Sequence, residues 1–598
     1  MKVSDYISQF LVDIGIKHLF LISGGGMMHL LDSVGKQEGL ECIYNLNEQA
    51  SGICGESYGQ YTNKIGACMV TTGPGATNAI TGCAGAWLDS TPVIYISGQC
   101  RIAQMGQLMG LRQYGAQEIA IIPCVKPITK YAEIVLEKND IAYHLEKAYY
   151  LATHGRRGPV WLDIPLDIQG AQINENELKH FVPKEEKKSV ISEGDIDRLI
   201  EMFNESKRPL ILIGHGAIAS EIGESIHDFC KEYNVPAEAT WRAKGIFDDD
   251  EPFYFGSPGI PTTRFSNYVL QNADLVLIIG TRLNAAITAY DEKHFASYAK
   301  KIIVDIEQKE IDKLDIGFEQ KYVCDSKDFW NIFVSKKSAI IKKERKQWLN
   351  YCLDVKKRYD IEFEKQPYDN ENLVDGYKFA LELSKFSKVS DVFVGSSSGR
   401  TCGISHIAYK VKRGQKFVTS MGLGSMGWCL PSAIACCFAS GKRRTLVLEG
   451  DGSLQHNIQE LQLIKTYSLP LKVFVWNNNG YASIYTMQRN NFDFRLAGCN
   501  EQSGLLLPHC KDVANTYGLD YYVIKNNDEI NTILQAVMKD DRPVLCEILA
   551  SINFDEIPKS MTIANKDGTF SSSRLEYLYP FIDEEEQKRN MPNWDTNE

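Results

Sequence analysis

Two polar motifs bordered by glycine each follow an apolar run in the last third of the chain. Asp451 lies in GDG after TLVLE, and Asn478 lies in NNNG after KVFVW. Parallel strands joined by a helix bring their carboxyl ends to one edge of a sheet, where Mg²⁺ can take carboxylate and amide oxygens and share the rest of its shell with ligand phosphates. Gly480 would add a main-chain carbonyl, and Gly450 and Gly452 would let the backbone approach the phosphates. The spacing therefore predicts a magnesium and phosphate site.

The elements that must position this site follow an α/β rhythm along the whole chain. Apolar strands such as HLFLISG, PLILIGHGA and TLVLEGDGS end near Gly or Asp and are followed by helical patterns. Charged stretches separate three such groups, and this organisation is typical of parallel sheets covered by helices. We predict an α/β fold of three doubly wound parallel-sheet domains, with a polar tail at the end; the ranges are 1–180, 190–345, 366–550 and 551–598.

Composition narrows the class of partner. The net charge of -11 argues against nucleic acid or an anionic membrane surface, because both need clustered Lys and Arg. The 16 Cys are scattered, many in apolar runs such as SAIACCFAS, and they indicate core positions instead of disulfides or a zinc site. We expect a cytoplasmic, soluble protein with small-molecule partners, no nucleic acid and no membrane.

Beyond these two motifs, the chain resembles the acetohydroxyacid (acetolactate) synthase large subunits, a family of thiamine diphosphate and Mg²⁺ dependent enzymes. The segments NLNEQASGICGE, TTGPGATNAITGCAGAWLDSTPVIYISGQ, GRRGPVWLDIP and GLGSMGWCLPSAIA occur in the family's order. The resemblance implies pyrimidine-binding, middle and diphosphate-binding domains. It also implies an active site built from two subunits, so we expect a homodimer at least, or a homotetramer.

The resemblance assigns the catalytic positions. Glu48, in NEQ, takes the place of the glutamate that hydrogen-bonds the aminopyrimidine ring and promotes cofactor deprotonation. Gln117, in AQE, matches a glutamine near the reactive carbon. The family's histidine before the glutamate is Asn47 here, and no role is transferred to it.

The same comparison gives the positions expected around the cofactor. Pro74 and Asn78 match the turn and helix start that border it, and Met426 matches the residue that holds it in a bent shape. The remaining positions expected to bind the cofactor are Gly399, Arg400, Thr401, Gly424, Gly450, Asp451, Gly452, Ser453, Asn478 and Gly480, with Asp451, Asn478 and Gly480 as the metal ligands. For Arg400, an exposed turn arginine is the alternative reading.

The acceptor pocket is where the sequence departs from the family. A family phenylalanine is Ala116 here, and a family Gln-Trp-Gln is Thr486-Met487-Gln488. With Lys130 and Ser483, Ala116 and Met487 form the expected substrate pocket, which is wider than the family's. We therefore expect a carboligase that decarboxylates a 2-oxo acid, with pyruvate as the expected donor, and passes the two-carbon unit to a keto sugar or a second 2-oxo acid.

Three alternatives stay open. A simple 2-oxo acid decarboxylase would carry an acid where this chain has Ile484, and a non-catalytic thiamine diphosphate-binding protein would be expected to lose Glu48 or the metal ligands. A dinucleotide oxidoreductase is weaker, because neither GHGAIA nor SGGGMM reads GxGxxG.

FAD is possible but not expected, since the family's acidic flavin segment appears here as GTRLNAAITA, which keeps only Arg282. The tail is a candidate cover for the active site that orders on cofactor binding.

Overall fold

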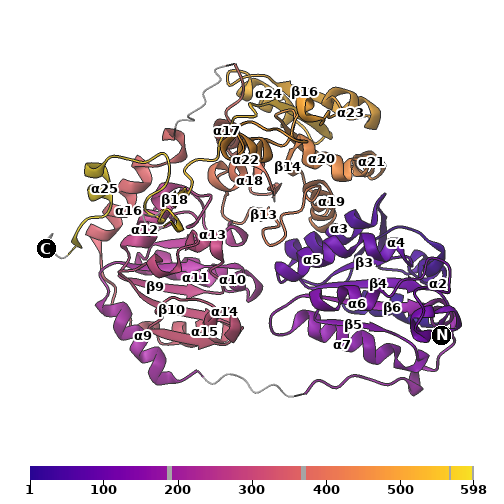
Figure 1. Cartoon of the computed structure of the whole chain (residues 1–598). Helices are drawn as coiled ribbons and strands as arrows, with labels where there is room; N and C mark the ends of the chain where they lie inside the picture. Colours follow the sequence, from indigo (N-terminus) through magenta and orange to yellow (C-terminus); the bar gives the residue numbers. More distant parts are fainter. Residues whose placement is uncertain (185–190, 365–371, 397, 565–567, 595–598) are drawn as a thin grey trace.

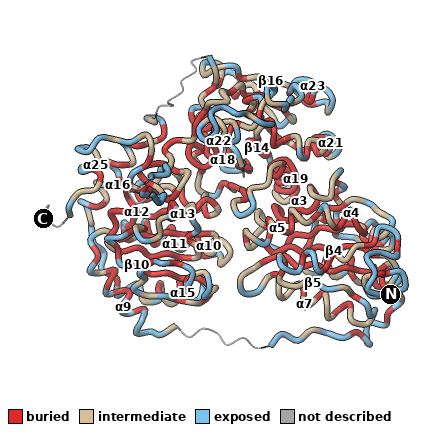
Figure 2. The backbone as a smooth tube through the Cα atoms, in the orientation of Figure 1, coloured by how far each residue is buried: buried red, intermediate tan, exposed pale blue. Residues whose placement is uncertain are grey.

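The computed structural model describes residues 1–184, 191–364, 372–396, 398–564 and 568–594. Three parallel β-sheets, each covered by helices on both faces, follow one another along the chain (Figure 1). The strands are mostly buried, as the red segments in Figure 2 show, because sheets covered on both faces need apolar residues on both sides. This arrangement confirms the predicted fold class.

The first unit is built on a six-stranded sheet of order β2-β1-β3-β4-β6-β5. Its strands are β1 (His18–Leu21), β2 (Glu41–Tyr44), β3 (Gly66–Val70), β4 (Val93–Gln99), β5 (Tyr131–Ile134) and β6 (Pro159–Pro165). Its main helices are α1 (Val3–Asp13), α2 (Met28–Lys36), α3 (Glu48–Thr62), α4 (Pro74–Asn78), α5 (Ile80–Leu88) and α7 (Ile141–Thr153). The turns after β2 and β3 lead into α3 and α4, so they carry the first predicted site residues.

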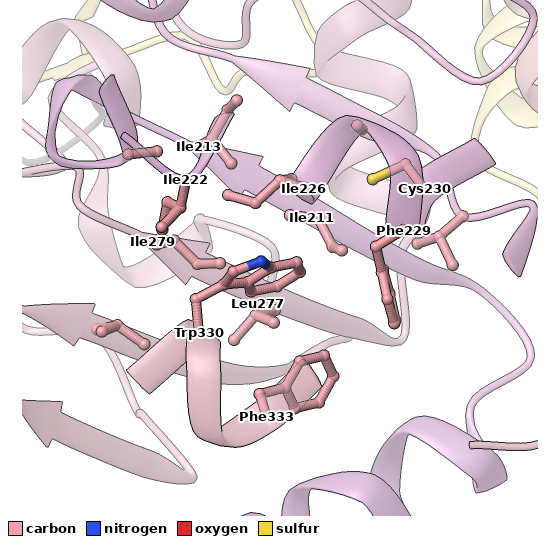
Figure 3. Packing of buried hydrophobic residues seen from close by; sticks show 14 of the residues in the cluster. Ile211, Ile213, Ile222, Ile226, Phe229, Cys230, Leu277, Ile279, Trp330 and Phe333 are labelled. Atoms are coloured by element: carbon pink, nitrogen blue, oxygen red, sulfur yellow. The ribbon is translucent and has the colours of Figure 1, made fainter. Parts of the chain in front are cut away.

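The middle unit has a five-stranded sheet of order β11-β10-β9-β7-β8. The strands are β7 (Pro209–Ile213), β8 (Ala237–Ala239), β9 (Leu275–Ile279), β10 (Lys300–Asp305) and β11 (Gln320–Val323). One face is covered by α9 (Glu193–Glu205), α11 (Gly223–Tyr233) and α15 (Ser326–Ser335), and the other by α12 (Arg264–Asn272) and α16 (Lys346–Arg358). Figure 3 shows Trp330 packed among isoleucines and leucines of the strands and of α11, with its ring nitrogen donating to Ser225 Oγ at 2.9 Å.

The third unit repeats the strand order of the first: β13-β12-β14-β15-β17-β16. Its strands are β12 (Val392–Val394), β13 (Lys416–Val418), β14 (Thr445–Gly450), β15 (Leu471–Asn477), β16 (Asp520–Ile524) and β17 (Val544–Leu549). Its main helices are α17 (Gly376–Phe386), α18 (Arg400–Gly403), α19 (Cys429–Ala439), α21 (Leu461–Thr466), α22 (Ala482–Asn491), α23 (Cys510–Tyr517) and α24 (Ile530–Val537). The two outer units therefore share one topology.

The first and third units also share a hydrophobic core. Helix α3 packs against α19, and Phe20 and Ile53 belong to the same buried cluster as Cys436 and Cys437. All sixteen cysteines are free thiols in the structure. Apolar contact across the boundary makes these two units one packed body.

The tail after β17 crosses to the middle unit. Arg264 of α12 donates to the carbonyls of Leu578 and Pro580 at 2.8 and 2.6 Å, and Trp594 donates to Asn272 Oδ1 at 3.0 Å. The tail also holds a short antiparallel pair, β18 (Thr562–Ala564) with β19 (Phe570–Ser572), and helix α25 (Glu584–Asn590). The last part of the tail therefore covers α12 and α16. That the tail also covers the active site stays a prediction. In the described part of the chain, no helix is long and apolar enough to cross a membrane.

Candidate active site

Asp451 begins the short helix α20 (Asp451–Leu454), directly after β14. The residue is 5% exposed, and its carboxylate accepts backbone hydrogen bonds from Gly452 at 2.8 Å and Gly480 at 3.1 Å. Burial raises the pKa of Asp451 to about 7, although these backbone donors act in the opposite direction. A buried carboxylate with only backbone donors is a group whose charge a bound cation would compensate.

Asn478 directly follows the neighbouring strand β15 (Leu471–Asn477), and it is almost as buried as Asp451. Its Oδ1 atom has no hydrogen-bond partner among the described residues. A buried amide oxygen without a donor costs about 1–3 kcal/mol, so such an atom normally has an ion or water against it. One carboxylate and one amide oxygen at adjacent strand ends fit the few protein ligands that Mg²⁺ takes when phosphates supply the rest.

Within the described ranges, no group of three or more His, Cys, Asp or Glu side chains could hold a metal. The predicted set contains one carboxylate, one amide and one main-chain carbonyl, so it is of a different kind. The glycines around it are needed for space: a methyl group on Gly452 would collide with the Tyr481 ring, and one on Gly480 with the Cys499 carbonyl.

Glu449 is a residue of this site that sequence reasoning missed. This buried carboxylate accepts from Ser453 Oγ and from the Leu430 backbone at 3.1 Å, and Ser453 Oγ in turn accepts from the Gly427 backbone at 2.9 Å. The start of α19 and the loop before it are thereby tied to the GDG turn. That loop carries Met426, which is partly exposed, and Gly424, whose φ is +64°. An acid inside the apolar run TLVLE was the available signal.

Residues 399–401 lie beside the same turn. Gly399, with a φ of +68°, precedes α18, and a methyl group on Gly450 would lie 4.0 Å from Thr401 Oγ1. The Arg400 side chain is buried, which excludes an exposed turn arginine, and it bonds to Thr486 and Asp555. Cofactor binding by these three residues stays a prediction.

Glu48 is the first residue of α3 in the first unit. Asn78 Nδ2, at the end of α4, donates to Glu48 Oε2 at 3.0 Å, so the structure brings these two predicted residues together. Asn47 caps α3, because its side-chain oxygen accepts from the Gln49 backbone at 2.8 Å. A capping role therefore accounts for an asparagine where the family has histidine.

Gln117 and Pro74 lie close to this pair. The backbone of Gln117 has a φ of +57° and packs tightly on Gly73. A methyl group added to Gly73 would collide with the Gln117 carbonyl. Burial would raise the pKa of the adjacent Glu118 carboxyl, but four backbone N–H donors from residues 106–115 outweigh it and the pKa is lowered. Glu118 thus fixes the loop before Gln117. The side chains of Pro74, Asn78, Ala116 and Gln117 are exposed.

The expected substrate-pocket residues come from two places. Lys130 donates to the His154 carbonyl at 2.6 Å in the first unit, and its side chain lies against Gly158. Ser483 and Met487 lie on the exposed side of α22 in the third unit. The structure thus places Lys130 and Glu48 in the first unit, and Ser483, Met487 and Asp451 in the third.

A cavity of about 330 Å³ lies where the three units meet, at the carboxyl ends of the middle strands. Its lining includes Arg282, Arg242 and Asp89. Asp89 accepts from the backbones of Met421 and Gly422 at 3.2 and 3.1 Å, and the Arg242 guanidinium lies beside it, so all three units meet at this carboxylate. The volume is at the lower end of ordinary small-molecule pockets, and flavin binding there stays the alternative that the sequence left open.

Comparison with known proteins agrees with this geometry. Three family profiles match the chain: the thiamine pyrophosphate enzyme N-terminal TPP binding domain at residues 1–122, the central domain at 196–330 and the C-terminal TPP binding domain at 397–548. The acetolactate synthase large subunit of Cyanidium caldarium is 28% identical over 91% of this chain and 92% of its own. A probable acetolactate synthase large subunit of Methanocaldococcus jannaschii is 29% identical over 92% of each chain, and the Escherichia coli isozyme 2 large subunit 27% over 94% and 97%.

The chain therefore belongs to the thiamine pyrophosphate-dependent enzymes. Within that family it is an enzyme of the acetolactate synthase type, which confirms the resemblance seen in the sequence.

Proposed function

We propose that the enzyme decarboxylates a 2-oxo acid, with pyruvate as the expected donor, and transfers the two-carbon unit to a carbonyl acceptor. A keto sugar or a second 2-oxo acid fits the pocket that the sequence predicts. The observation that carries the proposal is the exposed side of α22: Ser483, Ile484 and Met487 lie there, and no residue of α22 is acidic. Without an acid to protonate the two-carbon unit, an acceptor has time to react with it.

The proposed catalytic and cofactor-positioning residues come from the first and third units. When bound, thiamine diphosphate supplies the electron sink for the carbon that loses carbon dioxide. Glu48 would hydrogen-bond a ring nitrogen of the aminopyrimidine and share a proton with it, while the Asn78 amide donates to Glu48 Oε2 and orients the carboxyl group. Gln117 would lie near the reacting carbon, and Met426 would hold the cofactor in its bent shape.

Magnesium belongs to the same proposal. Asp451, Asn478 and the Gly480 carbonyl would bind Mg²⁺, and the ion would hold the diphosphate against Gly450 and Gly452. Two features support this assignment: the Asp451 carboxylate is buried among backbone donors, and Asn478 Oδ1 has no partner within the described residues. Gly399, Arg400, Thr401, Gly424 and Ser453 would complete the contacts on this side.

The proposed assembly is a homodimer at least, or a homotetramer, in the cytoplasm. It is supported by the open surface around Glu48, where Pro74, Asn78 and Gln117 are exposed. The loop before Gln117 also exposes large apolar side chains, with Leu108, Leu111 and Tyr114 49%, 51% and 65% exposed. A patch of this kind is typical of a protein interface.

The test is carbon dioxide release from pyruvate with thiamine diphosphate and Mg²⁺, alone and with a panel of aldehydes, 2-oxo acids and keto sugars. Release stimulated by one acceptor class supports the carboligase and names its partner. Fast release to acetaldehyde that no acceptor alters would replace it with a simple decarboxylase, and silence with every donor tried would point to a binding protein.

A further inference from the structure

Arg400 occupies a buried position between α22 and the segment that follows β17. Its Nη2 donates to Thr486 Oγ1 at 2.7 Å, and its Nη1 donates to Asp555 Oδ1 at 3.2 Å and lies 3.6 Å from Glu556 Oε2. The residue is 9% exposed. The guanidinium therefore joins a helix that carries predicted acceptor-pocket residues to a strip of chain that lies outside that pocket.

The two carboxylates that face Arg400 are themselves held in place. Glu556 Oε1 accepts from the Gly403 backbone at 2.9 Å, and Asp555 pairs with Lys559. Two cations thus face two carboxylates; Arg400 and Asp555 are buried, and Glu556 and Lys559 are partly exposed. Because an unpaired charge is costly in such a place, Arg400 has little freedom to leave it.

The strip itself is fixed to the core of the third unit. The Phe554 ring packs against the rings of Tyr377 and Trp476, each with centroids 5.4 Å apart. The Ile557 backbone N–H donates to Tyr377 Oη at 3.0 Å. The segment 553–557 is therefore a rigid support, and Arg400 transmits its position to α22.

A second arginine makes a parallel connection. Arg489, one turn further along α22 than Thr486, donates to Asn553 Oδ1 at 2.8 Å. The other end of α22 follows directly from the metal-site loop, where the Tyr481 backbone donates to the Cys499 carbonyl at 2.8 Å. The helix is thus held at its start by the metal loop and along its buried side by the segment 553–556.

The exposed side of α22 carries Ser483 and Met487, which are four residues apart and so share one helix face. Any shift of the helix on its support moves both side chains together. We propose that Arg400 is a positioning residue that sets the acceptor selectivity of the enzyme, by holding α22 against residues 553–556. This inference rests on the proposed carboligase function and adds the support on which its acceptor pocket depends.

The test is the variant Thr486→Val, which removes the hydroxyl acceptor of Arg400 and keeps a side chain of similar shape. The readout is the product ratio from two competing acceptors at concentrations below saturation, because this ratio reports relative kcat/KM and is unaffected by a general loss of active enzyme. The bond that is lost has a charged donor, and such a hydrogen bond contributes about 1.5 kcal/mol or more, so we expect the ratio to shift about tenfold. Acceptor-independent carbon dioxide release should stay near the wild-type rate. Thr516→Val is the matched control, since Thr516 is an exposed helical threonine of α23 whose hydroxyl bonds its own helix.

Hydrogen exchange of the α22 amides separates failure of this inference from failure of the proposed function. Thr486→Val should speed exchange across residues 482–491 and leave α21 unchanged, whether or not an acceptor is known. Asp555→Asn, which weakens the same support from the other side, should shift the exchange in the same direction. Unchanged α22 exchange, or an unchanged product ratio when the wild type does use acceptors, would overturn the positioning role.

Discussion

The first and third units share one strand order, yet they present their carboxylates in opposite ways. In the third unit, Asp451 is buried, with only backbone donors, and the Oδ1 atom of Asn478 has no partner among described residues. In the first unit, Glu48 is partly exposed, and one of its carboxylate oxygens accepts a hydrogen bond from the Asn78 amide. The third unit thus offers a buried carboxylate whose charge a bound cation would compensate. The first unit offers a solvent-accessible carboxylate that can exchange a proton. The contrast suggests that one side of the site holds the cofactor and the other side acts on it.

Removing the buried carboxylate should have the largest effect. Asp451→Ala should weaken thiamine diphosphate retention by at least about 100-fold, because the proposed magnesium site would lose the carboxylate of its predicted ligand set. Quenching of tryptophan fluorescence in a magnesium titration would measure it. Wild-type affinity in this variant would remove Asp451 from the metal site.

The open carboxylate should behave differently when it is neutralised. Glu48→Gln should bind magnesium and thiamine diphosphate within about threefold of wild type, yet lose roughly 100-fold or more of its turnover, as expected for a group that moves a proton. Steady-state kinetics beside the same titration would show the split. If turnover survived, or if affinity fell together with turnover as in Asp451→Ala, the two carboxylates would not have separate roles.

A third carboxylate joins the two units and should give the shared core a pH dependence. Burial raises the pKa of Glu56 to about 8, and Glu56 accepts from Trp428 Nε1 of the third unit at 3.1 Å. The folded protein therefore keeps a proton there that the unfolded chain releases near its ordinary pKa, so stability is lost as pH rises from about 4.5 to 8. Glu56→Gln should reduce this loss by on the order of 1–3 kcal/mol, measured as the difference between denaturant midpoints at pH 5 and pH 8. Equal pH dependence in both proteins would contradict the buried, protonated state.

The smallest expected effect concerns how Glu48 is placed. Asn47→Ala removes the side-chain cap of α3 and should lower the free energy of unfolding by about 1 kcal/mol, whereas Asn47→Asp keeps an oxygen at the cap and should cost less. Urea denaturation would compare the three proteins. If both variants were equally unstable, the amide itself and not the cap would be the feature that matters.

Sequence patterns predicted the fold class, because strands covered on both faces must be apolar, and they also predicted that Asp451 and Asn478 would lie at adjacent strand ends. They did not predict the support around Arg400, since Asp555 and Glu556 are distant in sequence and only tertiary packing brings them to α18. The capping role of Asn47 has a local signal, an asparagine before a helix, which the resemblance to a family with histidine there obscured. Glu449 has a local signal as well, and its partner Ser453 is close in sequence, but only tertiary packing brings the Leu430 backbone to it.

The most direct test of the account is carbon-13 nuclear magnetic resonance of the products formed from pyruvate labelled at its two non-carboxyl carbons, in the presence of the acceptor that most stimulates carbon dioxide release. The account predicts that both labelled carbons appear together as an acetyl unit bonded to the acceptor. Label found only in acetaldehyde or in unreacted pyruvate would contradict transfer of the two-carbon unit.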